Sequence, residues 1–273
     1  MQPTIVIRDI DSPAEMRLVE ELQKDVWGIP DIEIVPSSQL MAATHAGGVL
    51  LGAFDGDVLA GFAYGFVAKE DGKIAHHSHM VGVQKKYRSL DLGFRLKAAQ
   101  RERIIGQGIQ LMSWTFDPLQ SLNAYFNFAK LGVTARKYFV DFYGSDAASF
   151  LHQNGTDRLW VTWELTSDRV IERLRKEARS EGPDDSPLLV ECGENDMPIR
   201  YDLEPGLAGD SASIEIPTEI SWIESNDKAL AAEWRQVTRE AFVAAMKNEF
   251  VVRDFHRVDR SGKNVGIYRL SKI

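Results

Sequence analysis

Two side chains that could act as general bases lie on or directly after predicted strands. His79 lies in the apolar run IAHHSHMVGV, where strand alternation places it on the same face as Val81 and Val83. Asp117 follows the apolar run IQLMSWTF. A histidine or a carboxylate can take a proton from an amine when it is suitably placed and its pKa is close to the working pH. Each also has a simpler interpretation, since His79 could be a hydrogen-bonded sheet histidine and Asp117 could cap the following helix. Both are therefore kept as candidate bases.

A basic turn joins the strand that contains His79 to the next predicted helix. The stretch VQKKYRSLDLGFRLK carries Lys85, Lys86 and Arg88 before Gly93. If the helix begins near Leu90, the backbone N–H groups of residues 88–93 point into one concavity, where the helix dipole also favours an anion. Taken alone, the stretch is better explained as a solvated basic turn.

Hydrophobic patterns predict a mixed α/β fold in which a mixed central sheet is flanked by helices. Over residues 1–166 the expected order is β-α-α-β-β-β-α-β-α-β-β, with a tight hairpin turn at Asp55-Gly56-Asp57 and a helix over 119–131. An antiparallel meander followed by a crossover helix gives a sheet with helices on both faces. We expect a helix and a linker over 167–187, where the polar stretch SEGPDDSP lies. An appended α+β segment is expected over 188–273.

The appended segment is expected to hold a long helix over 226–247 and a final hairpin. Trp234, Arg235 and Arg239 are spaced to share one face of that helix, which suits either core contacts or a carboxylate clamp. Core packing and ion pairing are the expected explanation. We expect the segment to shape or cover the site of an acceptor substrate.

The turn, in its place between a meander strand and a helix, resembles the acyl-CoA site of the GNAT acetyltransferase superfamily. The superfamily signature there is Q/R-x-x-G-x-G/A; Arg88 and Gly93 match its ends, while Asp91 replaces the middle glycine. The Asp91 carboxylate must then point outward, away from bound phosphates. The resemblance implies that acyl-CoA is bound by residues of this strand and turn, namely Val81, Val83, Arg88, Ser89, Leu90, Asp91, Leu92 and Gly93.

The stretch NAYFNFAKLG resembles a second segment of the superfamily. Ala124, Phe128, Lys130 and Gly132 occur at the matching offsets. Phe128 stands where many members have a tyrosine that protonates the departing thiolate. Tyr125, one helical turn earlier, could substitute for that tyrosine only if the helix is rotated or shifted.

Two amides of the same predicted helix are candidate substrate ligands. Asn123 and Asn127 are four residues apart and would share one face of an α-helix, where they could orient a substrate carboxylate or amide. Helix capping and packing explain the pair equally well.

The combination of SHMVGV, WTFDPLQSLNAYFNFAKLG, DFYG and DRLWVTWEL is similar to a poorly characterised GNAT branch found beside N-acylamino-acid racemases. The resemblance implies an acyl-CoA-dependent N-acyltransferase. It would move an acetyl or succinyl group directly, in a ternary complex, to a small-molecule amine such as a D-amino acid. The alternative is a non-catalytic acyl-CoA-binding or regulatory module, which the phenylalanine at position 128 favours.

Composition bounds the partners and the compartment. A net charge of −8 argues against a nucleic-acid partner, which needs a surplus of Lys and Arg. The single Cys192 excludes an intrachain disulfide, and no window predicts a membrane span or a secretion signal, so we expect a cytoplasmic protein. His76 and His77 point to opposite faces of a strand, so we expect no metal. A homodimer is left open.

Overall fold

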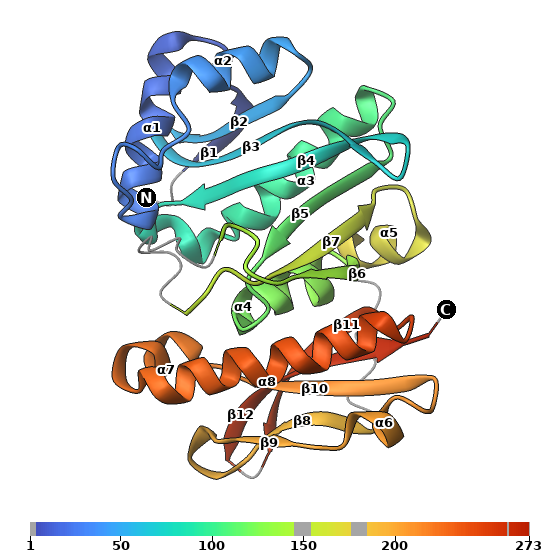
Figure 1. Cartoon of the computed structure of the whole chain (residues 1–273). Coiled ribbons are helices and arrows are strands. Elements are labelled where there is room, and N and C mark those ends of the chain that lie inside the picture. The colour runs from blue at the N-terminus through green and yellow to red at the C-terminus, as the bar shows by residue number, and fades with distance from the viewer. Residues whose placement is uncertain (1–3, 145–153, 176–184, 261, 273) are drawn as a thin grey trace. The chain divides into compact units, whose positions relative to one another are not determined.

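The computed structural model describes residues 4–144, 154–175, 185–260 and 262–272, and the chain forms two compact units (Figure 1). Unit 1 comprises residues 1–114, 149–151 and 164–166, and unit 2 comprises residues 115–148, 152–163 and 167–273. The predicted mixed α/β class is confirmed. The predicted three-part division at residues 166 and 187 stays a prediction, and much of its linker lies outside the described residues.

Unit 1 follows the predicted order of elements. These are β1 (Ile5–Asp9), α1 (Pro13–Trp27), α2 (Ser37–His45), β2 (Val49–Asp55), β3 (Val58–Glu70), β4 (Lys73–Val83), the 3₁₀ turn η1 (Lys85–Leu90), α3 (Leu92–Gly106) and β5 (Leu111–Phe116), whose last two residues belong to unit 2. Strands β1 to β4 form an antiparallel meander, and β4 pairs with β5 in parallel. The predicted meander and crossover helix are therefore confirmed.

Helices α1 and α3 cover opposite faces of this sheet. Helix α1 begins where Ser12 Oγ accepts a hydrogen bond from the N–H of Glu15, at 3.2 Å, and its buried side chains pack around Phe62 of β3. Gly61, the preceding residue, faces the other way: a Cβ atom there would lie 3.3 Å from Leu96 of α3. The sheet of unit 1 is thus buried on both faces.

Unit 2 carries the other strands and the long C-terminal helix. Its elements after β5 are α4 (Ser121–Ala124), the π-helical η2 (Tyr125–Lys130), β6 (Thr134–Phe139), β7 (Arg158–Glu164), α5 (Asp168–Arg175), β8 (Leu188–Cys192), η3 (Glu194–Asp196), β9 (Pro198–Arg200), α6 (Leu203–Gly206), β10 (Ser211–Pro217), α7 (Ile220–Asn226), α8 (Lys228–Lys247), β11 (Val251–Arg260) and β12 (Lys263–Ser271). The strands lie in the order β7-β6-β11-β12-β10-β8-β9. The predicted final hairpin is β11–β12.

Helix α8 supplies the aromatic core of unit 2. It begins after Asp227, whose side chain accepts a hydrogen bond from the N–H of Leu230, so the predicted start at residue 226 falls within α7 instead. Trp234 and Phe242 of α8 are fully buried, and the Phe242 ring meets the Tyr268 ring of β12 edge-on at 5.1 Å. This edge-on contact packs α8 against the sheet.

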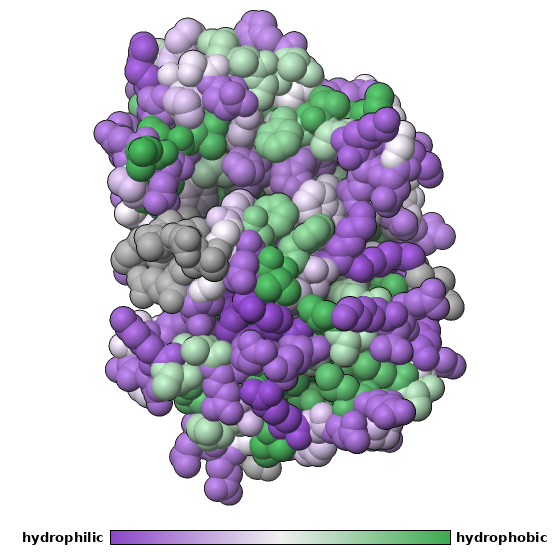
Figure 2. All heavy atoms as spheres, viewed as in Figure 1, coloured by the Kyte–Doolittle hydropathy of each residue, from purple (hydrophilic) through white to green (hydrophobic). Residues whose placement is uncertain are grey.

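The surface is mixed. On the face shown in Figure 2, hydrophilic residues predominate and are interrupted by smaller hydrophobic areas. None of the helices in the described ranges is long and apolar enough to span a membrane.

Candidate functional site

Strand β4 contains a bulge at His79. Its neighbour β3 pairs Tyr64 with Met80 and Gly65 with Ser78, so His79 is an extra residue with no partner opposite. A bulge bends its strand and turns side chains to new directions, and bulges are common next to active sites. The bulge therefore singles out the residue that sequence reasoning chose as a candidate base.

The bulge reverses which face His79 occupies relative to the two valines that follow it. The Cγ2 atom of Val83 and the Cδ1 atom of Leu96 both approach Gly61, so Val83 faces α3. The His79 ring instead lies 6.1 Å from the ring of Tyr64, which packs in the core beneath α1 and α2. The expectation that His79 shares a face with Val81 and Val83 is wrong, because simple alternation does not continue through an extra residue.

Aromatic rings lie beside the His79 ring, although the side chain is also exposed to solvent. Its centroid lies 5.7 Å from that of Phe66 and 6.3 Å from that of His77. Desolvation by this surrounding protein lowers the pKa of His79 below its ordinary value of 6.5, and it lowers the pKa of His77 to about 4. At neutral pH both imidazoles are unprotonated, as a proton acceptor must be.

The basic turn forms a backbone concavity at the start of α3. The right-handed 3₁₀ turn η1 ends at Asp91, which has φ 54° and ψ 28° and precedes the first residue of α3. Aspartate adopts this left-handed conformation more readily than most residues, which explains how it can stand where the signature has glycine. No Asp91 side-chain hydrogen bond caps α3. A right-handed residue followed by a left-handed one directs successive N–H groups to one side, where they can bind an anion.

Gly93 opens this concavity to the outside. A Cβ atom at Gly93 would have no heavy atom within 4 Å, and its φ is not positive. Neither the backbone conformation nor packing within the described residues therefore requires a glycine here. A side chain at this position would remove space for a ligand against the first turn of α3.

The remaining residues of the predicted donor site differ in what they can contribute. Arg88 is exposed and its Nε donates to the carbonyl oxygen of Val83 at 3.3 Å, and Ser89 is also exposed. Leu90 is half-buried and Leu92 is fully buried, so Leu92 can offer a ligand only its backbone.

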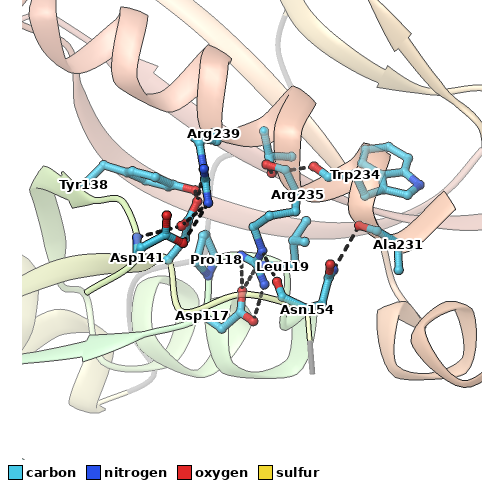
Figure 3. A network of polar contacts seen from close by, with 12 residues as sticks. Asp117, Pro118, Leu119, Tyr138, Asp141, Asn154, Ala231, Trp234, Arg235 and Arg239 are labelled. Atoms are coloured by element: carbon cyan, nitrogen blue, oxygen red, sulfur yellow. Dashed lines mark hydrogen bonds and ion pairs between the residues drawn. The ribbon is translucent and has the colours of Figure 1, made fainter. Parts of the chain in front are cut away.

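In unit 2, Asp117 is held by an arginine of α8 (Figure 3). Its two carboxylate oxygens accept hydrogen bonds from Arg235 Nη1 and Nη2 at 2.8 and 2.6 Å, and Oδ1 also accepts from the N–H of Leu119 at 2.9 Å. The capping interpretation of Asp117 is wrong, because α4 begins at Ser121 after Gln120 and no side-chain hydrogen bond caps it. The bond from Leu119 belongs to the turn before the helix. The role of Asp117 as a base stays a prediction, which this ion pair opposes because both oxygens are already engaged.

A second arginine of α8 binds a neighbouring pair of carboxylates. Arg239 donates to both oxygens of Asp157 at 2.8 and 2.7 Å and to Asp141 at 3.0 Å, while the Tyr138 hydroxyl donates to Asp157 at 2.7 Å (Figure 3). The two arginines thus clamp carboxylates, as their spacing allowed, but these carboxylates belong to the protein itself.

The predicted helix over 119–131 widens into the π-helical turn η2. The N–H of Leu131 bonds to the carbonyl of Phe126, five residues earlier, at 3.1 Å. Asn123 is exposed and Asn127 is buried, so the two amides lie in different surroundings. Their roles as substrate ligands stay predictions.

The two aromatic residues of this turn lie in different surroundings. Phe128 is fully buried, with its ring 5.8 Å from that of Tyr268 and 6.2 Å from that of Phe116. Tyr125 is 39% exposed. The residue at the tyrosine position of the signature is therefore a core residue, and the acid role of Tyr125 stays a prediction.

Sequence reasoning missed a buried lysine of unit 1. Lys97 of α3 is 3% exposed, and its Nζ lies 2.8 Å from Ser78 Oγ of β4 and 3.4 Å from the centre of the Trp114 ring of β5. The signal was its position: Lys97 lies beside Leu96 and one helical turn before Gln100, within the helix face that meets the sheet. A lysine on such a face is unusual.

No family model matches the sequence, and no curated protein matches it. Solved structures do. A Desulfovibrio desulfuricans protein assigned to the GNAT acetyltransferase family has 16% identity and a TM-score of 0.48, covering 60% of this chain and 100% of its own. The ribosomal-protein-S18-alanine N-acetyltransferase of Escherichia coli has 10% identity and a TM-score of 0.49, covering 60% and 96%. The aminoglycoside 6'-N-acetyltransferase of Enterococcus faecium has 15% identity and a TM-score of 0.45, covering 59% and 98%. At this level of similarity the comparisons describe the fold alone.

Proposed function

We propose that the protein is an N-acyltransferase that uses acyl-CoA as its donor. The observation that carries this proposal is the concavity before α3, where Asp91 has a left-handed backbone and Gly93 has open space beside it. A diphosphate needs several backbone N–H groups and the positive end of a helix dipole, and this turn offers both. The exposed Arg88 adds positive charge at the rim.

The donor would extend from this turn along β4. Its diphosphate would bind the N–H groups of residues 88–93, and its arm would lie along Val83 and Val81 toward the bulge. The five residue steps from Val83 back to Ser78 span about 16 Å of strand. That length suits an extended arm ending beside His79.

The transfer itself needs a neutral amine. We propose that His79 takes the proton of the acceptor, since its ring is unprotonated at neutral pH and stands at the bulge. The amine nitrogen then attacks the thioester carbonyl carbon, and the CoA thiolate leaves. The acetyl or succinyl group and an amino-acid acceptor, D-amino acids included, follow from the sequence resemblance.

Release of free CoA thiol tests the reaction. Purified protein is incubated with acetyl-CoA or succinyl-CoA and a panel of amines that includes D- and L-amino acids, and thiol appearance is followed by a chromogenic disulfide. Acceptor-dependent release is expected with at least one pair. Binding of CoA in a calorimeter without turnover on any acceptor would instead support a non-catalytic binding module.

A tryptophan at position 93 tests the donor site. Gly93→Trp should weaken CoA binding at least tenfold, about 1.4 kcal/mol, because the indole fills the open space against α3. Calorimetric titration with CoA measures this change.

Gly106→Trp is the matched control. Gly106 lies in the same helix, and it too has no heavy atom within 4 Å of a Cβ position. This variant should bind CoA as the unmodified protein does. Unchanged affinity in Gly93→Trp, with a native circular dichroism spectrum, would exclude the turn as the CoA site.

A further inference from the structure

The amine of Lys97 is enclosed in unit 1, and no carboxylate among the described residues contacts it. Its contacts within the described residues are the Ser78 hydroxyl at 2.8 Å, the Met112 sulfur at 3.9 Å and the face of the Trp114 ring. Ser78 Oγ in turn donates to Gln100 Oε1 at 2.8 Å. A buried lysine is normally paired with an acid, so this arrangement is unusual.

Such surroundings favour the neutral amine. Desolvation by complete burial lowers the pKa of Lys97 well below its ordinary value of 10.5. The titratable groups packed near it are histidines of β4, and His76 is likewise held neutral, with a pKa of about 3. A neutral lysine amine has a free lone pair and is a good nucleophile, whereas an ordinary surface lysine is protonated and unreactive.

Lys97 lies where a donor bound at the turn would end. It is one helical turn beyond Gly93 on α3, about 6 Å along the helix axis. Its partner Ser78 immediately precedes the bulge in β4. Just before Ser78, β4 pairs with β5, His76 with Met112 and His77 with Ser113. Figure 1 shows these strands side by side at this pairing and diverging beyond it.

We propose that Lys97 is a self-acylation site, whose amine takes the acyl group of a thioester donor. This inference rests on the proposed function for its natural donor, acyl-CoA. The Nζ lone pair attacks the thioester carbonyl carbon, a C–N bond forms and the C–S bond breaks. One amine proton passes to the sulfur, leaving an amide on Lys97 and a free CoA thiol. The amide is uncharged and suits this buried position better than an ammonium does.

Peptide mass spectrometry tests the proposal without any acceptor amine. The protein is incubated with acetyl-CoA between pH 6.5 and 8.5, and acetylation of Lys97 is compared with that of the exposed Lys69. Lys97 should be labelled faster at neutral pH, and its rate should rise less steeply with pH than that of an ordinary surface lysine. The acylation rate of an ordinary protonated amine rises roughly tenfold per pH unit. Excess CoA should suppress the label at Lys97 alone.

Two variants and a second donor complete the test. Lys97→Arg removes the nucleophile and should lose the label, and Gly93→Trp should lose it together with CoA binding. The acetyl thioester of N-acetylcysteamine, which lacks the diphosphate, tests the amine without the turn. CoA binding with no label at Lys97 would overturn this inference and leave the proposed function standing. Absence of CoA binding would overturn the proposed function. In that case, labelling of Lys97 by the small thioester would still support a reactive amine, and no labelling would overturn it.

Discussion

His79 differs from an ordinary sheet histidine in its position and in its pKa. Both differences favour a role as a base. It is the extra residue of a bulge, and desolvation lowers its pKa below 6.5. A depressed pKa means that the neutral, proton-accepting form persists as the pH falls through 6.5. Activity that depends on this form should therefore decline only at lower pH.

This placement gives a prediction for the pH profile of CoA release. The acid limb of kcat/KM should lie below pH 6.5, and His79→Gln should abolish the limb and lower the rate about 10²- to 10⁴-fold. Ionisation of the acceptor amine gives a separate rise at higher pH, which should persist in the variant. Initial rates measured from pH 5 to 9 separate the two.

The control at this scale is a histidine outside the sheet. His45 lies at the end of α2, and His45→Gln should keep the acid limb and the full rate. If His79→Gln keeps both as well, another group accepts the proton.

At the scale of elements, hydrophobic periodicity predicted the meander, the crossover helix, α8 and the final hairpin, since each pattern continues over several turns or strand pairs. The bulge at His79 and the π-helical turn at Tyr125 could not be predicted this way. Both depend on one extra residue in a hydrogen-bond pattern, and the apolar spacing around them stays compatible with regular structure. The bulge also shifted the face that His79 occupies.

Helix α8 offers an internal comparison between a buried and an exposed ion pair. Arg235 is 5% exposed and binds both oxygens of Asp117, whereas Glu240 of the same helix pairs with Arg200 where both side chains are exposed. Removing one partner of a buried pair leaves a charge without compensation in a medium that solvates it poorly. Surface pairs are screened by water.

The two pairs should therefore differ in their contribution to stability. Arg235→Met should lower the free energy of unfolding by about 3–5 kcal/mol, and Arg200→Met by about 1 kcal/mol or less. Urea unfolding followed by circular dichroism measures both. In the double variant with Asp117→Asn, much of the loss from Arg235→Met should be recovered, because no buried carboxylate charge remains. Equal effects of Arg235→Met and Arg200→Met would show that the clamp does not hold this end of β5.

At the scale of the whole molecule, buried neutral histidines make the folded chain sensitive to acid. Desolvation lowers the pKa of His76 to about 3 and that of His77 to about 4, whereas both titrate near 6.5 in the unfolded chain. Between these values the unfolded state binds more protons than the folded state. Stability is therefore complete above pH 6.5 and falls as the pH drops through this interval.

Replacing one of these histidines should flatten that dependence. His76→Gln removes one titrating group, so the slope of unfolding free energy against pH between 6 and 4 should decrease by about 1.4 kcal/mol per pH unit. Urea unfolding at several pH values measures the slope, and His45→Gln, at an exposed position, should leave it unchanged. The slope is compared instead of the unfolding free energy at one pH, because replacing a ring that contacts Gln100 also changes that free energy. A slope that stays the same in His76→Gln would mean that this histidine is already protonated in the folded protein near pH 6.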